Sequence, residues 1–168
     1  MKKLFLFIAI IIMVSCNNNP EKQIENILKD VVIENGSGMI SDYESLSMEF
    51  DTVRVSDIKQ FIEKCFPAEK YPNGVPADFK DEKFLGFIAP LKAQKADNDI
   101  VYLSVKHKYK ILNLLIDKKI EVIQQRLLDP TTYKYIGDDL RMDKTWMGVI
   151  QYEMDKASDE LDKILEKY

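Results

Sequence analysis

The sequence predicts an α+β fold, with one antiparallel sheet and helices packed on it. Apolar and polar residues alternate along Leu46–Thr52 and Val101–Ile111, which is the period of a half-buried strand. Apolar residues recur at helical spacing in Ile24–Val31, Ile58–Cys65 and Leu161–Leu165. Both kinds of element need a common core, so we expect the helices to cover the apolar face of the sheet.

The first fifteen residues have the organisation of a secretory signal peptide. Residues 1–3 are basic after the initiator methionine, Leu4–Val14 is a run of eleven apolar residues, and Ser15 is small. A membrane-spanning helix is the alternative. Eleven residues at about 1.5 Å each cover only about half of a bilayer core, so this alternative is disfavoured.

The tetrapeptide Met13-Val14-Ser15-Cys16 resembles the lipobox of bacterial lipoproteins, apart from Met13, where leucine is usual. The resemblance implies removal of residues 1–15, a diacylglycerol on the Cys16 sulfur and an acyl chain such as palmitate on its new amine. An ordinary signal peptide followed by a chance cysteine is the alternative. Because two lipid signals already give stable attachment, the resemblance predicts a lipid-anchored protein of the cell envelope.

The residues after Cys16 bear on its location. In lipoproteins an aspartate at the next position often retains the protein at the inner membrane, and Asn17 stands there in this chain. We therefore expect the outer membrane. No acidic run follows, which favours the periplasmic face over the cell surface. We expect a lipidated tether at 16–22 and a single α+β domain at 23–168.

Composition limits the classes of partner. Loss of the first 15 of 168 residues would leave 153, and loss of Lys2 and Lys3 would move the net charge from −4 to −6. A chain of this length builds one typical domain. Its mild acidity argues against a nucleic-acid partner, which requires a basic face.

The first two helices have recognisable ends. Pro20 favours a helix start after Asn19, and the glycines of residues 35–38 favour its end. Ser56 is the expected cap of the second helix, which Pro67 ends. Residues 67–83, with three prolines, predict a long loop.

The strand at Val101–Ile111 separates its residues onto two faces. The apolar face carries Val101, Leu103, Val105, His107, Tyr109 and Ile111, and the polar face carries Tyr102, Ser104, Lys106, Lys108 and Lys110. Residues 117–128 allow two interpretations. Asp117 can cap a helix that Asp129-Pro130 ends, or the chain can turn at Asp117–Lys119 into a hairpin.

The last third predicts two short strands and a helix. Tyr133–Ile136 is one expected strand, the alternation from Trp146 to Tyr152 predicts the other, and residues 161–168 predict an amphipathic helix. A weak similarity between residues 40–53 and 130–146 suggests two related helix–strand units. The helix, Asp-Pro, Tyr and strand pattern also loosely resembles small uncharacterised lipoproteins of Gram-negative envelopes, a resemblance that supplies no active site.

Two residues with reactive side chains fall on apolar faces. His107 is the single histidine, so mechanisms that need two imidazoles are excluded. We expect a core histidine bonded to a backbone group or a tyrosine. Cys65, on the apolar face of its helix, is expected to be a buried free thiol, because a nucleophile would need a nearby base and a polar setting.

The charged clusters each have a simple interpretation and a functional one. Residues 97–99 and 138–143 are rich in aspartate, but neither has the spacing of a calcium loop, and aspartates commonly make turns. No metal or other cofactor is therefore expected. Lys106, Lys108 and Lys110 are expected to lie on a solvated sheet face; the functional alternative is a patch for an acidic partner.

These observations favour a membrane-anchored, non-enzymatic binding module whose partner is an envelope protein or a glycan. A hydrolase with paired carboxylates stays open, because such pairs meet in space and not in sequence. A structural subunit of an outer-membrane assembly is the third hypothesis.

Overall fold

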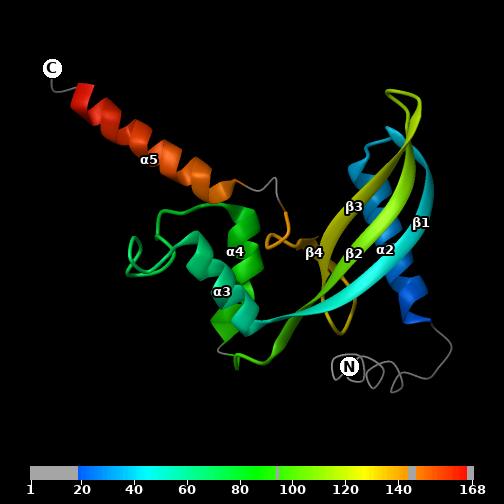
Figure 1. The fold of residues 1–168 in the computed structure, drawn as a ribbon, viewed down its shortest axis with the longest axis horizontal. Coiled ribbons are helices and arrows are strands. Elements are labelled where there is room, and N and C mark those ends of the chain that lie inside the picture. Colours follow the sequence, from blue (N-terminus) through cyan, green and yellow to red (C-terminus); the bar gives the residue numbers. More distant parts are fainter. Residues whose placement is uncertain (1–18, 94, 144–146, 166–168) are drawn as a thin grey trace.

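The computed structural model describes residues 19–93, 95–143 and 147–165. The expected signal peptide, Cys16, Trp146 and Tyr168 lie outside them. In chain order the elements are α2 (Pro20–Asn35), β1 (Ile40–Arg54), α3 (Val55–Cys65), α4 (Glu82–Ile88), the 3₁₀ turn η1 (Ala89–Ala93), β2 (Ile100–Asn113), β3 (Lys118–Leu128), β4 (Tyr135–Asp138) and α5 (Gly148–Leu165) (Figure 1).

The strands form one antiparallel sheet in the order β1-β2-β3-β4, which confirms the α+β prediction. The hairpin interpretation of residues 117–128 is correct and the helix is wrong. Leu103 to Asn113 pair with Leu128 to Lys118 in continuous register, and Asp117 takes a positive φ of 49° in the turn. Long-range pairing with the buried β2 therefore overrides the helical spacing of β3.

Helix α2 covers one face of the sheet. Asn19 caps it, since its side chain accepts a hydrogen bond from the Glu21 backbone N–H. Ile24, Leu28 and Val32 are buried against β2 and β3. The predicted stripe is confirmed apart from its last member, because Val32 and not Val31 faces the sheet.

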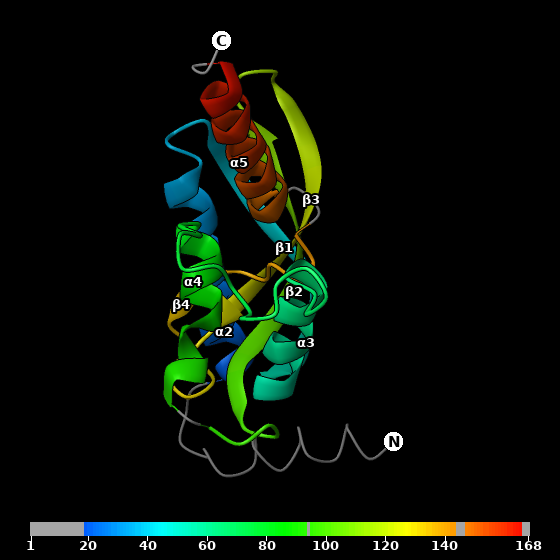
Figure 2. The same cartoon turned by 90° about the vertical axis from the view of Figure 1, so that its left-hand side faces the viewer.

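Helices α3 and α4 cover the opposite face, at the end of the sheet where β2 begins. Turning the molecule by 90° brings these helices and α5 to the front, with α2 behind (Figure 2). The core beneath them holds Val53, Val55, Ile58, Phe66, Phe79, Phe84, Phe87, Val101, Tyr102, Leu127 and Leu140. The rest of this sheet face, which carries Lys106, Lys108 and Lys110, is not covered by a described helix.

Strand β1 is irregular on both sides of Leu46–Thr52, where the sequence predicted plain alternation, and its register against β2 shifts at three places, the last between Val53 and Arg54. The first shift lies between Ser41 and Glu44 and the second between Ser45 and Ser47. The second shift leaves Leu46 exposed, although alternation placed it in the core. Extra residues in one strand rotate the following side chains to the other face.

Two predicted boundaries are wrong. Helix α3 begins at Val55, so Ser56 is inside its first turn, and the Asp57 carboxylate accepts from the Arg54 backbone N–H instead. Residues 148–152 are the first turn of α5 and not a strand. The two suggested helix–strand units therefore differ, because β3 stands where the second unit requires a helix.

Within the part of the chain that the structure describes, no helix has the length and apolar character needed to cross a bilayer.

Candidate functional site

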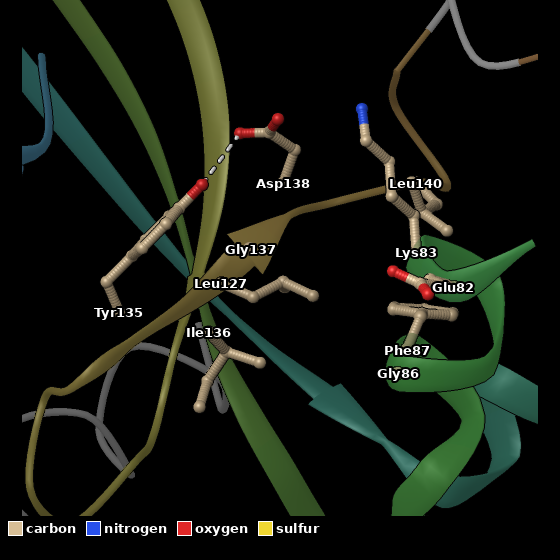
Figure 3. Close-up of a pocket in the computed structure, with 10 residues that line it drawn as sticks. All are labelled: Glu82, Lys83, Gly86, Phe87, Leu127, Tyr135, Ile136, Gly137, Asp138 and Leu140. Atoms are coloured by element: carbon tan, nitrogen blue, oxygen red, sulfur yellow. Dashed lines mark hydrogen bonds between the residues drawn. The ribbon is translucent and has the colours of Figure 1, made fainter. Parts of the chain in front are cut away.

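A groove of about 210 Å³ lies between α4 and β4, at the edge of the sheet (Figure 3). Its floor is apolar, formed by Phe87, Leu127 and Leu140, all of which are buried. Glu82, Lys83 and Gly86 form the wall on α4, and the wall on β4 consists of residues 135–138. The groove is therefore an apolar channel with polar rims.

The wall on α4 is fixed by a short helix with defined ends. Asp81 begins it, because its side chain accepts a hydrogen bond from the Phe84 backbone N–H at 2.8 Å. At the other end the buried hydroxyl of Tyr102 on β2 donates to the Phe87 carbonyl at 3.0 Å and to the Gly86 carbonyl at 3.3 Å. The Gly86 carbonyl also accepts a hydrogen bond from the Ala89 backbone N–H at the helix C-terminus. Tyr102 thus ties α4 to the sheet.

The wall on β4 is an edge strand of four residues. Its inner side pairs with β3, and no described strand pairs with its outer side. The Asp139 backbone N–H donates to the Gln125 carbonyl at 2.9 Å, so the N–H of the preceding Asp138 points away from β3. An edge of this kind can accept a further strand.

Asp139 also anchors this wall through its side chain, which is fully buried. The carboxylate accepts hydrogen bonds from the Arg141 guanidinium at 2.9 and 2.6 Å and from the Ser104 hydroxyl at 2.8 Å. Gln125 donates in turn to Ser104 at 3.0 Å. The charge is therefore paired and fully hydrogen-bonded, which a buried carboxylate requires.

Two glycines face the groove from opposite walls. Gly86 lies within α4 and Gly137 within β4, and an added Cβ at either position would meet no described atom within 4 Å. Neither has a positive φ. Glycine inside a helix or strand is less stable than alanine by about 0.5–1 kcal/mol, and here neither backbone conformation nor crowding requires it. What the two glycines share is the groove, into which a side chain at either position would project.

The rims supply charge and hydrogen-bonding groups. The Tyr135 hydroxyl donates to Asp138 at 3.4 Å on the side of β4 that is turned away from α4 (Figure 3). Burial and then the Asp138 charge raise the Tyr135 pKa. Glu82 and Lys83 are exposed on the other wall. Such an arrangement suits an apolar side chain in the channel and polar main-chain groups at its rims.

His107 is a core residue, as the sequence predicted. It is fully buried beneath α2, and its Nε2 is 2.8 Å from the Tyr43 hydroxyl and 3.3 Å from the Ser45 hydroxyl. Its Nδ1 has no partner among the described residues, so a protonated ring would lack an acceptor for its second N–H. Burial and then the nearby Arg126 charge lower the His107 pKa to about 4.

Cys65 is on the expected face of α3 but is half-buried and free, so full burial was the wrong expectation. Burial raises its thiol pKa, which opposes formation of a reactive thiolate. The aspartates of 97–99 make turn and ion-pair contacts, with Asp97 bound to Lys59 and Asp99 to the Ala96 N–H.

The three predicted patch lysines lie in a row on the uncovered sheet face. Lys106 forms an ion pair with Glu49 at 3.1 Å, and Lys108 forms one with Glu121 at 2.7 Å. Each glutamate comes from a neighbouring strand. These pairs favour a solvated face, and a role of Lys106, Lys108 and Lys110 in binding stays a prediction.

The turn between β2 and β3 exposes three successive apolar residues, Leu114, Leu115 and Ile116. The Leu114 N–H donates to the carbonyl of Met39, which is also exposed, at 3.0 Å. Sequence reasoning missed both this turn and the groove. The exposed turn could have been found in the sequence, because three consecutive apolar residues stand where the hairpin turns. The groove has no such local signal, because its walls are about fifty residues apart.

We expect Asp139→Ala to lower the free energy of unfolding by about 3 kcal/mol or more, because it leaves the Arg141 charge and the Ser104 hydroxyl without their acceptor. Urea unfolding followed by circular dichroism measures this. Asp138→Asn, one residue away on the partly exposed rim, is the matched control and should change stability by less than about 0.5 kcal/mol. Equal losses in the two variants would contradict the anchoring role.

We expect stability to fall as the pH is lowered from about 6.5 towards 4. The unfolded chain binds a proton at His107 over this range and the folded chain does not, so protons favour unfolding. The full effect is about 3 kcal/mol. Urea titrations at several pH values measure it. Since the chain has one histidine, His107→Gln should remove most of the slope between pH 6.5 and 5, and an unchanged slope would contradict this assignment.

Comparison of the sequence with protein-family models and with curated proteins, and comparison of the fold with solved structures, gave no match.

Proposed function

We propose that this chain is a lipid-anchored recognition module of the cell envelope, which binds an extended segment of a partner protein along β4. The partner segment adds a strand to the open edge of the sheet and places an apolar side chain in the groove between α4 and β4. The observation that carries this proposal is the pair of glycines, Gly86 and Gly137, which keep the groove open without another structural reason.

Strand addition combines two kinds of contact. Main-chain hydrogen bonds to an edge strand provide affinity without regard to sequence, and a pocket beside the edge selects alternate side chains. The structure offers both, since no described strand pairs with the outer side of β4 and the channel floor of Phe87, Leu127 and Leu140 lies next to it. A partner with an apolar residue at every second position fits this geometry.

The anchor is supported by the sequence alone. The basic start, the apolar run and the Ser15-Cys16 junction resemble a lipoprotein signal. Attachment through Cys16 at the periplasmic face of the outer membrane would hold the groove close to other envelope proteins. No metal or other cofactor takes part in this proposal.

A carboxylate-based hydrolase is the second candidate, because Glu82 and Asp138 both border the groove. The Asp138 carboxylate points towards Tyr135 and away from Glu82, so Asp138 would have to turn to act with Glu82 (Figure 3). Among the described residues no group of three or more histidines, cysteines or acids could hold a metal ion. In this second candidate the two acids would act on a bound water.

We expect Gly137→Leu to abolish peptide binding while the fold is retained. The added side chain fills the groove, and the backbone at Gly137 tolerates a Cβ. The detergent-solubilised full chain would be used to select from a displayed library of random peptides, and the dissociation constants of enriched peptides would then be measured. Gly137→Leu should raise them at least about tenfold. Gly137→Ala is the matched control and should bind nearly as the wild type does.

The selection also separates the alternatives. Enrichment of peptides with alternating apolar residues supports strand addition. Peptides that bind Gly137→Leu and the wild type equally would contradict the groove. Cleavage of a bound peptide that stops in Glu82→Gln or Asp138→Asn would make the hydrolase the correct class.

We expect Gly86→Ala to raise the free energy of unfolding by about 0.5–1 kcal/mol, because alanine is the better helix former and nothing crowds its Cβ. Thermal or urea unfolding measures this. A destabilised Gly86→Ala would show that glycine is required by the fold, and the argument from the two glycines would then fail.

A further inference from the structure

Helix α5 carries an apolar stripe that is exposed along its whole described length. The stripe begins at Met147, just before the helix, and its members follow at alternate spacings of three and four: Met147, Ile150, Met154, Ala157, Leu161 and Ile164. The five large side chains are each between 52% and 60% exposed. Alternate spacing of three and four is the a and d pattern of a coiled coil, in which each such residue inserts between four residues of a facing helix.

The opposite side of α5 is held against the body of the protein. The Tyr152 ring packs edge-on against Phe79 at 5.4 Å, and its hydroxyl donates to Asp78 at 2.9 Å. Lys70 forms an ion pair at 2.7 Å with Glu153, which lies at the border between this side and the stripe. Tyr152 occupies the position opposite the a and d residues, so these contacts fix α5 with its stripe turned outward.

Beyond Glu153 the helix leaves the body and projects away from the sheet (Figure 1). Every described side chain from Met154 to Ile164 is exposed. Isolated helices shorter than about 12–15 residues are marginally stable in water. The part of α5 that projects, from Met154 onward, has about this length. A partner that covers its apolar stripe would stabilise the helix and best explains why it forms.

We infer that α5 pairs with the α5 of a second copy of this chain in a parallel, in-register coiled coil. The residues that flank the stripe are Gln151 and Ser158 on one side and Glu153 and Glu160 on the other. In a parallel pair, the flank with Glu153 and Glu160 on one helix lies against the flank with Gln151 and Ser158 on the other. Glu153 of one copy therefore meets Ser158 of the second copy. An antiparallel pair would bring the two Glu160 residues together.

The charges on α5 disfavour a lipid surface as the occupant. Its polar positions hold Glu153, Asp155, Asp159, Glu160 and Asp162 against Lys156 and Lys163. Helices that lie on membranes usually carry lysine and arginine on the polar face, because membrane surfaces are anionic. No residue of α5 lines the groove, so pairing through α5 does not depend on the proposed function.

Self-association of the full chain in detergent, measured by sedimentation equilibrium over a range of concentrations, tests this inference. The coiled coil spans only about 27 Å, so we expect a dimer that dissociates on dilution. The double variant Met154→Glu, Leu161→Glu should weaken dimerisation at least about 100-fold. Lys163→Glu is the matched control, because it changes the net charge by the same amount at a position outside the stripe, and it should leave the dimer intact.

Engineered disulfides test the orientation. Leu161→Cys should cross-link two copies on mild oxidation, because equivalent a positions adjoin in a parallel pair, whereas Asp159→Cys, on the outer side, should not. A monomer at every concentration, or a dimer that survives the double glutamate variant, would overturn the inference. Efficient cross-linking only between Ala157→Cys and Leu161→Cys chains would show an antiparallel pair and overturn the stated geometry.

Discussion

The buried carboxylate of Asp139 is the contact on which the rest of this fold depends. It accepts hydrogen bonds from Ser104 of β2 and from Arg141, while its backbone N–H pairs with Gln125 of β3. Arg141 also lies 3.9 Å from Asp57 of α3. Asp139 and Arg141 together therefore connect the sheet, helix α3 and the end of β4. A strand of four residues has few ladder bonds of its own, so the position of this groove wall is set by the buried charge.

Helices cover the two faces of the sheet at different places along the strands, and this explains which surfaces are exposed. Helix α2 buries the apolar face of β2 from Leu103 to Ile111, while α3 and α4 cover the other face only near Tyr102. The central part of that second face is left to charged residues in cross-strand pairs. Among the described residues, exposed large apolar side chains gather in the turn at Leu114–Ile116 and along α5, while others stand singly elsewhere on the surface. The groove beside β4 adds a third apolar surface. A recognition module of this shape can bind at such clusters.

Local patterns in the sequence correctly predicted helices and strands that bury one apolar face. The strand at 101–111, the helix that begins at Pro20 and the end of α3 at Cys65 are confirmed, and so is a tyrosine partner for His107. The helix proposed for 117–128 failed because Ile120, Ile123 and Leu127 fit helical spacing, whereas their conformation is decided by pairing with β2. The strand proposed near 148 failed because Ile150 belongs to a stripe with a helical period.

The candidate site was beyond the reach of sequence patterns for a physical reason. Gly86 and Gly137 have no side chains, so nothing in a local pattern marks them, and their proximity depends on the packing of α4 against the sheet edge. Bulges in β1 likewise leave no local signal, although they direct Tyr43 and Ser45 towards His107. The spacing on α5 was visible in its last part, but its extent required knowledge of which helix face packs on the body.

The central claim is that a partner segment pairs with β4 beside the groove. Hydrogen exchange of the Asp138 amide, measured by NMR with and without a peptide selected by the wild-type chain, tests this most directly. This N–H points away from β3, so it exchanges freely until another strand accepts its hydrogen bond. The account predicts strong slowing of exchange at Asp138 when the peptide is bound. Unchanged exchange at Asp138, with protection instead at Leu114–Ile116 or along α5, would contradict it.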